Sequence, residues 1–233
     1  MAERCAVIGV GQTVAKSKRE DVSIAGLVRE AALAALEDAG LTFADIDAVV
    51  VGKAPDMFEG VMMPELYLAP ALGAVGKPMF RVHTAGSVGG STAIVASHLV
   101  ASGVHERVLT VAFEKQSDSD AMWALSVPQP FSPPLLAGAG GYFAPIIRAY
   151  MRRSGAPDHI GILVAVNPSG GALAANALMV AGLTRIGEAA QRIIDGGVRR
   201  ALAHATSGPC LQQNLVCALA ASPDAPASPA GGA

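Results

Sequence analysis

Aromatic and charged residues are scarce in this chain. Phe, Trp and Tyr make up 4% of its 233 residues, and charged residues make up 15%, with 17 Lys and Arg against 19 Asp and Glu. A protein that binds nucleic acid needs a basic surface for the phosphates, and single strands also need aromatic rings for stacking. The balanced charge and the few rings therefore predict no nucleic-acid partner.

Cysteines and long apolar runs are also few. The three cysteines, Cys5, Cys210 and Cys217, are an odd number without the spacing of metal ligands, which argues against a disulfide framework and against a metal site. The longest apolar stretch, 87–104, is interrupted by Ser, Gly, Thr and His, so we expect no membrane span. The N-terminal residues lack the apolar core of a secretory signal, and we therefore expect a cytoplasmic protein.

Apolar residues are abundant, at 52% of the chain, and they fall in short runs that alternate with helical stretches. Strands are predicted at 5–10, 48–52, 79–83, 107–113, 158–166, 200–205 and 215–219. Helices are predicted at 24–39, 65–72, 87–102, 141–153 and 173–194. This alternation predicts an α/β fold in which helices cover both faces of a sheet.

Residues 79–103 contain the most informative junction, where a predicted strand runs through Thr84, Ala85 and Gly86 into Ser87 and then into a helix. The first N–H groups of a helix lack intrahelical partners and the helix dipole is positive there, so a nucleophile or an anion is stabilised at this point. A simpler interpretation is that Ser87 only caps the helix, as Ser commonly does.

Three motifs could give the glycine-containing segments a function. Gly9 and Gly11 begin a dinucleotide fingerprint, but Val14 stands at its third glycine and no helix begins there. Residues 86–92 resemble a phosphate-binding loop without its Lys, which argues against a nucleotide triphosphatase. Residues 85–89 resemble the nucleophile elbow of α/β-hydrolases.

A serine hydrolase would combine Ser87 with an acid and a base that follow it in the chain. Asp158 or Asp195 could supply the acid and His204 the base. No oxyanion-binding segment of the hydrolase type precedes Ser87, which weakens this interpretation.

An ordered set of segments resembles the thiolase superfamily, and most closely its sterol-carrier and lipid-transfer type. The segments are CAVIGVGQT, VREAALAALEDAGLTFADIDAVVVG, HTAGSVGGSTAIVASHL, NPSGGALAANALMVAGLTRIGEAA and ALAHATSGPCLQQN. The resemblance covers nearly all of the chain except its end. It implies a thiolase-like layered αβαβα fold of two similar halves, with the second half incomplete.

The resemblance also implies a division of the chain. Residues 1–166 correspond to the N-terminal half, with part of the lid at about 116–160, and residues 167–220 are a remnant of the C-terminal half. Residues 221–233 have the composition of a disordered tail. A large segment that the family carries is missing just before Asn167, including the motif that lines its oxyanion site. We therefore expect an apolar face on the first half that is uncovered unless a partner or a dimer covers it.

Five positions are implied to form the site. The catalytic Cys of the family lies at the N-terminus of its central helix, where this chain has Ser87, and a serine is not ionised near neutral pH without a base. Asn176 stands near the catalytic His, and Cys210 near the second catalytic Cys. Gly170 and Gly171 stand at a turn beside the substrate pocket.

The family acts on acyl-CoA thioesters by acyl transfer or by forming and cleaving C–C bonds. The resemblance implies an acyl-CoA or sterol side-chain CoA substrate, no bound cofactor or metal apart from the coenzyme A of the substrate, a homodimer, and an OB-fold partner protein of the kind that assists members without the Cys. Beside the weaker serine-hydrolase interpretation, two interpretations remain: an impaired acyltransferase without ordinary thiolase activity, and a non-catalytic truncated homologue that retains acyl-CoA binding or a dimerisation role.

Overall fold

The central sheet has three parallel strands in the order β2-β1-β3. The strands are β1 (Ala48–Gly52), β2 (Met79–Val82) and β3 (Val108–Ala112). The computed structural model that defines them describes residues 5–14, 16, 18–53, 59–115, 118, 138–157, 180–207 and 213–223. All of β1 is buried, as expected of a central strand that is covered on both faces.

Helices cover both faces of this sheet. Helix α1 (Ile24–Asp38) lies on one face, and α3 (Val88–Ala101) lies on the other and connects β2 to β3. Val49 and Val51 belong to the apolar cluster on the α1 side, whereas Val50 belongs to the cluster on the α3 side. This alternation follows from the two-residue repeat of a strand.

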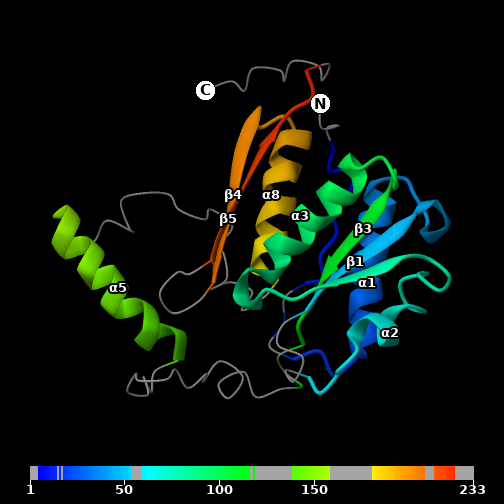
Figure 1. Ribbon diagram of the computed structural model, residues 1–233, viewed down its shortest axis with the longest axis horizontal. Coiled ribbons are helices and arrows are strands. Elements are labelled where there is room, and N and C mark those ends of the chain that lie inside the picture. Colours follow the sequence, from blue (N-terminus) through cyan, green and yellow to red (C-terminus); the bar gives the residue numbers. More distant parts are fainter. Residues whose placement is uncertain are drawn as a thin grey trace.

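The second half of the chain adds a helix and a hairpin. Helix α8 (Ala181–Ile194) lies beside α3, and β4 (Arg200–Ser207) pairs antiparallel with β5 (Gln213–Ala220). Ile186 of α8 packs with Ala203 of β4. Figure 1 shows α3 and α8 between the parallel sheet and this hairpin, so the described layers run helix, sheet, helix, sheet. The α/β prediction is therefore confirmed.

The two central helices approach each other through glycines. A Cβ atom added at Gly182 of α8 would lie 2.5 Å from the backbone N of Gly90 in α3 and 2.9 Å from the Cβ of Ala205 in β4. Such distances are shorter than real contacts of a Cβ atom. The absence of side chains at both glycines therefore lets two helices and a strand meet at one point.

Two further α-helices, α2 and α5, lie outside these layers. Helix α2 (Pro64–Leu68) packs near α1 and β2 and is shorter than the predicted helix at 65–72. Helix α5 (Gly138–Ser154) confirms the helix predicted at 141–153 and stands apart from the layers in Figure 1. Within the described part of the chain, none of the helices combines the length and the apolarity needed to cross a membrane.

The strand predicted at residues 5–10 is wrong, because this described segment pairs with no strand. It lies instead against α1, where a methyl group at Gly9 would overlap the carbonyl oxygen of Ala35. The backbone N of Val10 donates a hydrogen bond of 2.9 Å to Asp38 Oδ2 at the end of α1. The segment at 5–10 therefore packs against α1 and does not pair with the sheet.

Parts of the predicted organisation lie outside the described residues. These parts are the strand at 158–166, the first turns of the helix at 173–194 and the boundary at residue 166. The division into two halves with a lid and a tail therefore stays a prediction.

Replacing Gly182 by Ala should destabilise the fold, because the new methyl group would meet backbone atoms that cannot move aside. We expect Gly182→Ala to lower the free energy of unfolding by about 1–3 kcal/mol, the usual range for overpacking. Gly187→Ala, on the same helix, is the matched control, because its methyl group would meet only the side chain of Val10. Urea unfolding followed by circular dichroism measures both, and equal losses would contradict the tight glycine crossing.

Candidate functional site

The junction between β2 and α3 has an unusual backbone. A single 3₁₀ turn, Ala85–Ser87, leads into α3. Ala85 has a φ of 48° and is the one described residue other than glycine in the left-handed region. An L-residue with a side chain is strained in this region, and such strain tends to occur at functional sites. The backbone therefore marks the junction as a candidate site independently of its side chains.

Ser87 is almost completely buried, with 1% of its surface exposed. Its Oγ lies 2.8 Å from the carbonyl oxygen of Thr84 and 2.7 Å from Oε1 of Gln213 on β5. The hydroxyl of Thr84 donates a hydrogen bond of 2.7 Å to Oγ of Ser91, one turn further along α3. Hydroxyl and amide groups thus form a small polar network at the start of the central helix.

The interpretation of Ser87 as a simple helix cap is wrong. Ser87 is the N-cap residue of α3 by position, but its side chain makes no capping hydrogen bond. The side chain bonds instead to Thr84 and Gln213. The first turn of α3 contains no acidic residue to offset the positive end of the helix dipole. The junction therefore favours a negative charge or a carbonyl oxygen.

Among the described residues, the groups that contact the Ser87 hydroxyl are all neutral, and none of them is a base. Activation of a serine requires an adjacent group that can take its proton. A backbone carbonyl, a side-chain amide and another hydroxyl do not do this near neutral pH. The described contacts of Ser87 therefore hold it as an alcohol.

The residues proposed for a serine hydrolase are not assembled around Ser87. His204 is exposed, and its Nε2 lies 3.1 Å from Oδ1 of Asn214 on the adjacent strand. Asp195 follows the end of α8 and accepts a hydrogen bond of 2.9 Å from Gln191. Neither residue bonds to Ser87, and Asp158 lies outside the described residues. The geometry thus gives the hydrolase interpretation no support.

The other predicted site residues lie outside the described part of the chain. Asn176, Cys210, Gly170 and Gly171 are in this group, and their roles stay predictions. The residue that the sequence analysis missed is Gln213. Its position just after Cys210, at the start of a closing strand, was the one available indication that it could reach the site.

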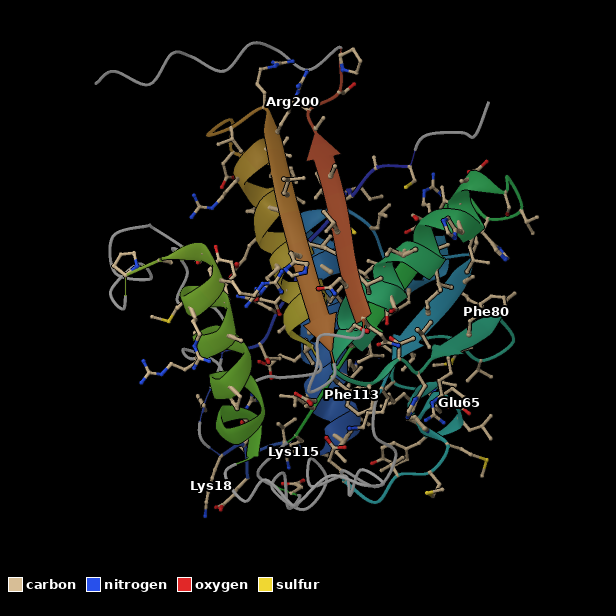
Figure 2. All side chains as sticks on the ribbon, turned by 60° about the vertical axis from the view of Figure 1, so that its left-hand side comes forward. Lys18, Glu65, Phe80, Phe113, Lys115 and Arg200 are labelled. Atoms are coloured by element: carbon tan, nitrogen blue, oxygen red, sulfur yellow. The ribbon has the colours of Figure 1, made fainter. Side chains whose placement is uncertain are left out.

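A buried ion pair lies at the carboxyl edge of the parallel sheet. Lys53, directly after β1, pairs with Glu59, and neither side chain is exposed. Glu59 Oε1 also accepts a hydrogen bond of 2.6 Å from the backbone N of Lys115, and Lys53 Nζ lies 5.2 Å from the centre of the Phe113 ring. Figure 2 shows Phe113 and Lys115 at the end of β3. The pair therefore joins the segment at residue 59 to the ends of β1 and β3.

Metal ligands do not gather in the described parts of the chain. No group of three or more His, Cys, Asp and Glu side chains is close enough there to hold an ion. Cys217 of β5 is half-buried, and burial raises the pKa of its thiol. The described chemistry is thus concentrated in the network around Ser87.

Two curated proteins are similar in sequence to about half of this chain. An acetyl-CoA acetyltransferase of Methanothermobacter thermautotrophicus is 36% identical over 117 residues, which is 48% of this chain and 30% of that protein. Sterol carrier protein 2 of Gallus gallus is 28% identical over 118 residues, which is 50% of this chain and 21% of that protein. Both matches support the resemblance of the chain to the thiolase superfamily. Its likeness to the sterol carrier protein agrees with the lipid-transfer type, so the predicted resemblance is confirmed.

The chain covers only a small part of each relative, which limits the conclusions that can be drawn from them. The matched segments span less than a third of either curated relative, and no protein-family model matches the chain. A solved structure described as an Ltp2-ChsH2(DUF35) aldolase is 30% identical and covers 65% of this chain and 38% of that one, with a TM-score of 0.49. A structural likeness this partial supports no conclusion about function.

We expect Ser87 not to react with a fluorophosphonate probe, because reactive serines need an adjacent base and the described partners of Ser87 are neutral. Labelling is measured by mass spectrometry of the intact protein, with Ser87→Ala as the control and an active serine hydrolase as the standard. Labelling of the natural chain that disappears in Ser87→Ala would restore the hydrolase interpretation.

Proposed function

We propose that this thiolase-superfamily chain binds acyl-CoA or sterol side-chain CoA thioesters at the start of α3 and lacks ordinary thiolase activity. The observation that carries the proposal is the buried Ser87 hydroxyl, which stands at the expected nucleophile position and is held by neutral partners. The names of the two curated relatives support the class of substrate.

Thiolysis would require a nucleophile that this site does not offer. A cysteine at a helix N-terminus ionises near neutral pH because the helix end lowers the pKa of its thiol. A serine in the same place keeps its proton, and Ser87 has no base among its hydrogen-bond partners in the described part of the chain. The first acyl transfer of the thiolase reaction is therefore blocked at position 87.

The junction can still bind the carbonyl group of a thioester. The positive end of the α3 dipole favours an electronegative oxygen at this point. Binding and polarisation of this kind need no covalent intermediate. They are compatible with lipid transfer, and also with C–C bond cleavage assisted by an OB-fold partner, which is part of the proposal on the basis of the family resemblance.

The proposal predicts binding without turnover. Titration calorimetry with a long-chain acyl-CoA should show tighter binding than free coenzyme A, because the acyl chain buries apolar surface. Incubation with acetoacetyl-CoA and coenzyme A should give no loss of the substrate's ultraviolet absorbance. Equal affinities for the two ligands would contradict the proposed substrate, and thiolysis that Ser87→Ala abolishes would contradict the inactive nucleophile.

Ser87→Cys provides the complementary variant. Its thiolate should attack the thioester carbonyl of acetyl-CoA, form an acyl-sulfur bond and release coenzyme A as a thiol. Mass spectrometry should then show one acetyl group at position 87, and Ser87→Ala should show none. An unmodified Ser87→Cys variant that still binds acyl-CoA would place the reacting carbon away from position 87.

We also propose that the chain forms a homodimer through β2, an edge strand of the described sheet. Phe80 of β2 is 39% exposed. On and beside the neighbouring α2 the exposed apolar side chains are Met62, Met63, Leu66 and Tyr67. Figure 2 shows Phe80 and Glu65 of α2 on the same side of the molecule. An open edge with apolar neighbours is a site for pairing with another chain.

The dimer predicts a sensitivity to charge on β2. Phe80→Glu should shift the protein from dimer to monomer, because the charge would lose its hydration at the pairing edge. Leu33→Glu is the control, since Leu33 is also exposed, at 45%, but lies on α1. Sedimentation velocity measures the mass of each variant. A natural chain that sediments as a monomer at micromolar concentrations would overturn the dimer.

A further inference from the structure

The Ser87 hydroxyl has more hydrogen-bond contacts than it has protons. A serine hydroxyl carries one proton, yet Oγ of Ser87 is within hydrogen-bond distance of Thr84 O at 2.8 Å and of Gln213 Oε1 at 2.7 Å. Both contact atoms are oxygens that carry no hydrogen, so both are acceptors. Only one of the two contacts can therefore be satisfied by the single proton.

The carbonyl oxygen of Thr84 can only accept a hydrogen bond. A carbonyl oxygen carries no hydrogen, so its contact with Ser87 is a hydrogen bond only if Ser87 donates. The amide of Gln213 differs, because half a turn about its last bond exchanges the oxygen for an NH₂ group of nearly the same shape. Both contacts are satisfied when Ser87 donates to Thr84 and accepts from Gln213.

The remaining hydroxyl contact agrees with this arrangement. Thr84 Oγ1 lies 3.3 Å from Ser87 Oγ and gives its own proton to Ser91. It therefore supplies no hydrogen to Ser87. A buried hydroxyl oxygen that received no hydrogen bond would lose part of its hydration without compensation. Gln213 is the remaining donor among the described partners of Ser87.

We infer that Gln213 is a positioning residue whose amide N–H donates a hydrogen bond to the atom at position 87. It reaches this atom from β5, 126 residues away in the chain, and the residue as a whole is exposed. A donor aimed at this atom stabilises negative charge on it, or on a substrate oxygen that takes its place, at the positive end of α3. The inference deepens the proposed function and rests on the thioester being bound at the start of α3.

A thiol at position 87 reports the direction of this hydrogen bond. We place Ser87→Cys in a chain whose Cys5, Cys210 and Cys217 are replaced by alanine, and follow the thiolate by its ultraviolet absorbance as the pH is raised. A donor from Gln213 stabilises the thiolate and lowers the pKa of the thiol, whereas an acceptor stabilises the protonated thiol and raises that pKa. The two orientations therefore predict opposite signs.

Two substitutions of Gln213 decide between them. Gln213→Met keeps the length of the side chain without its donor, so the thiol pKa should rise and the thiolate fraction near neutral pH should fall about tenfold. Gln213→Glu replaces the donor by a charged acceptor and should lower the thiolate fraction further. A thiol pKa that is unchanged or lowered in Gln213→Met would overturn the inference.

Asn214→Asp is the matched control for charge. It makes the same change from amide to carboxylate on the next residue, whose Oδ1 contacts His204 rather than Ser87. We expect Asn214→Asp to leave the thiol pKa close to that of the parent. A shift equal to that of Gln213→Glu would show that any added negative charge nearby has the same effect, and it would overturn the inference. Thermal unfolding checks that each variant is folded.

The titration separates this inference from the proposed function. It uses no acyl-CoA, so a chain that fails to bind acyl-CoA can still show the hydrogen bond from Gln213. Conversely, the chain could bind acyl-CoA while the pKa of the thiol stays the same when Gln213 is replaced. That result would support the proposed function and overturn the role of Gln213 as a positioning residue.

Discussion

The contact of Gly90 with Gly182 is the constraint on which the rest of the described structure depends. Helix α3 packs against the parallel sheet on one side and against helix α8 on the other. Helix α8 in turn packs against the hairpin of β4 and β5. Without side chains at the crossing, the two helices and Ala205 of β4 approach to the limit set by their backbones. The layers can therefore pack as one body although they come from distant parts of the chain.

This close approach also builds the candidate site. Ser87 lies three residues before Gly90, and Gln213 begins the strand whose Leu215 lies against that glycine. A wider separation of the layers would take the Gln213 amide out of reach of the Ser87 hydroxyl. The same packing thus stabilises the fold and brings an amide to the start of the central helix.

The sequence predicted most elements of the described fold because each depends on local periodicity. Val49, Val50 and Val51 form a continuous apolar run, which is typical of a central parallel strand, and β1 has the predicted bounds of 48–52. The segment at 5–10 has a similar apolar pattern, but its glycines fit it against α1. Local pattern does not distinguish packing on a helix from pairing in a sheet.

The site was predictable at Ser87 and not at Gln213. Ser87 stands between a strand and a helix, so the chemistry of helix ends identifies it without tertiary information. Gln213 becomes relevant only through a contact across 126 residues, which depends on how two layers pack. Without that contact, Gln213 would be interpreted as an ordinary polar residue on the surface of a strand.

The buried pair of Lys53 and Glu59 affects how the carboxyl edge of the sheet can move. Separating the two side chains would leave an uncompensated charge on each in apolar surroundings, which is far more costly than losing an exposed ion pair. The backbone of Lys115 is held by the same carboxylate. The ends of β1 and β3 and the segment at residue 59 should therefore open together in a single cooperative step, and this edge should not fray one strand at a time.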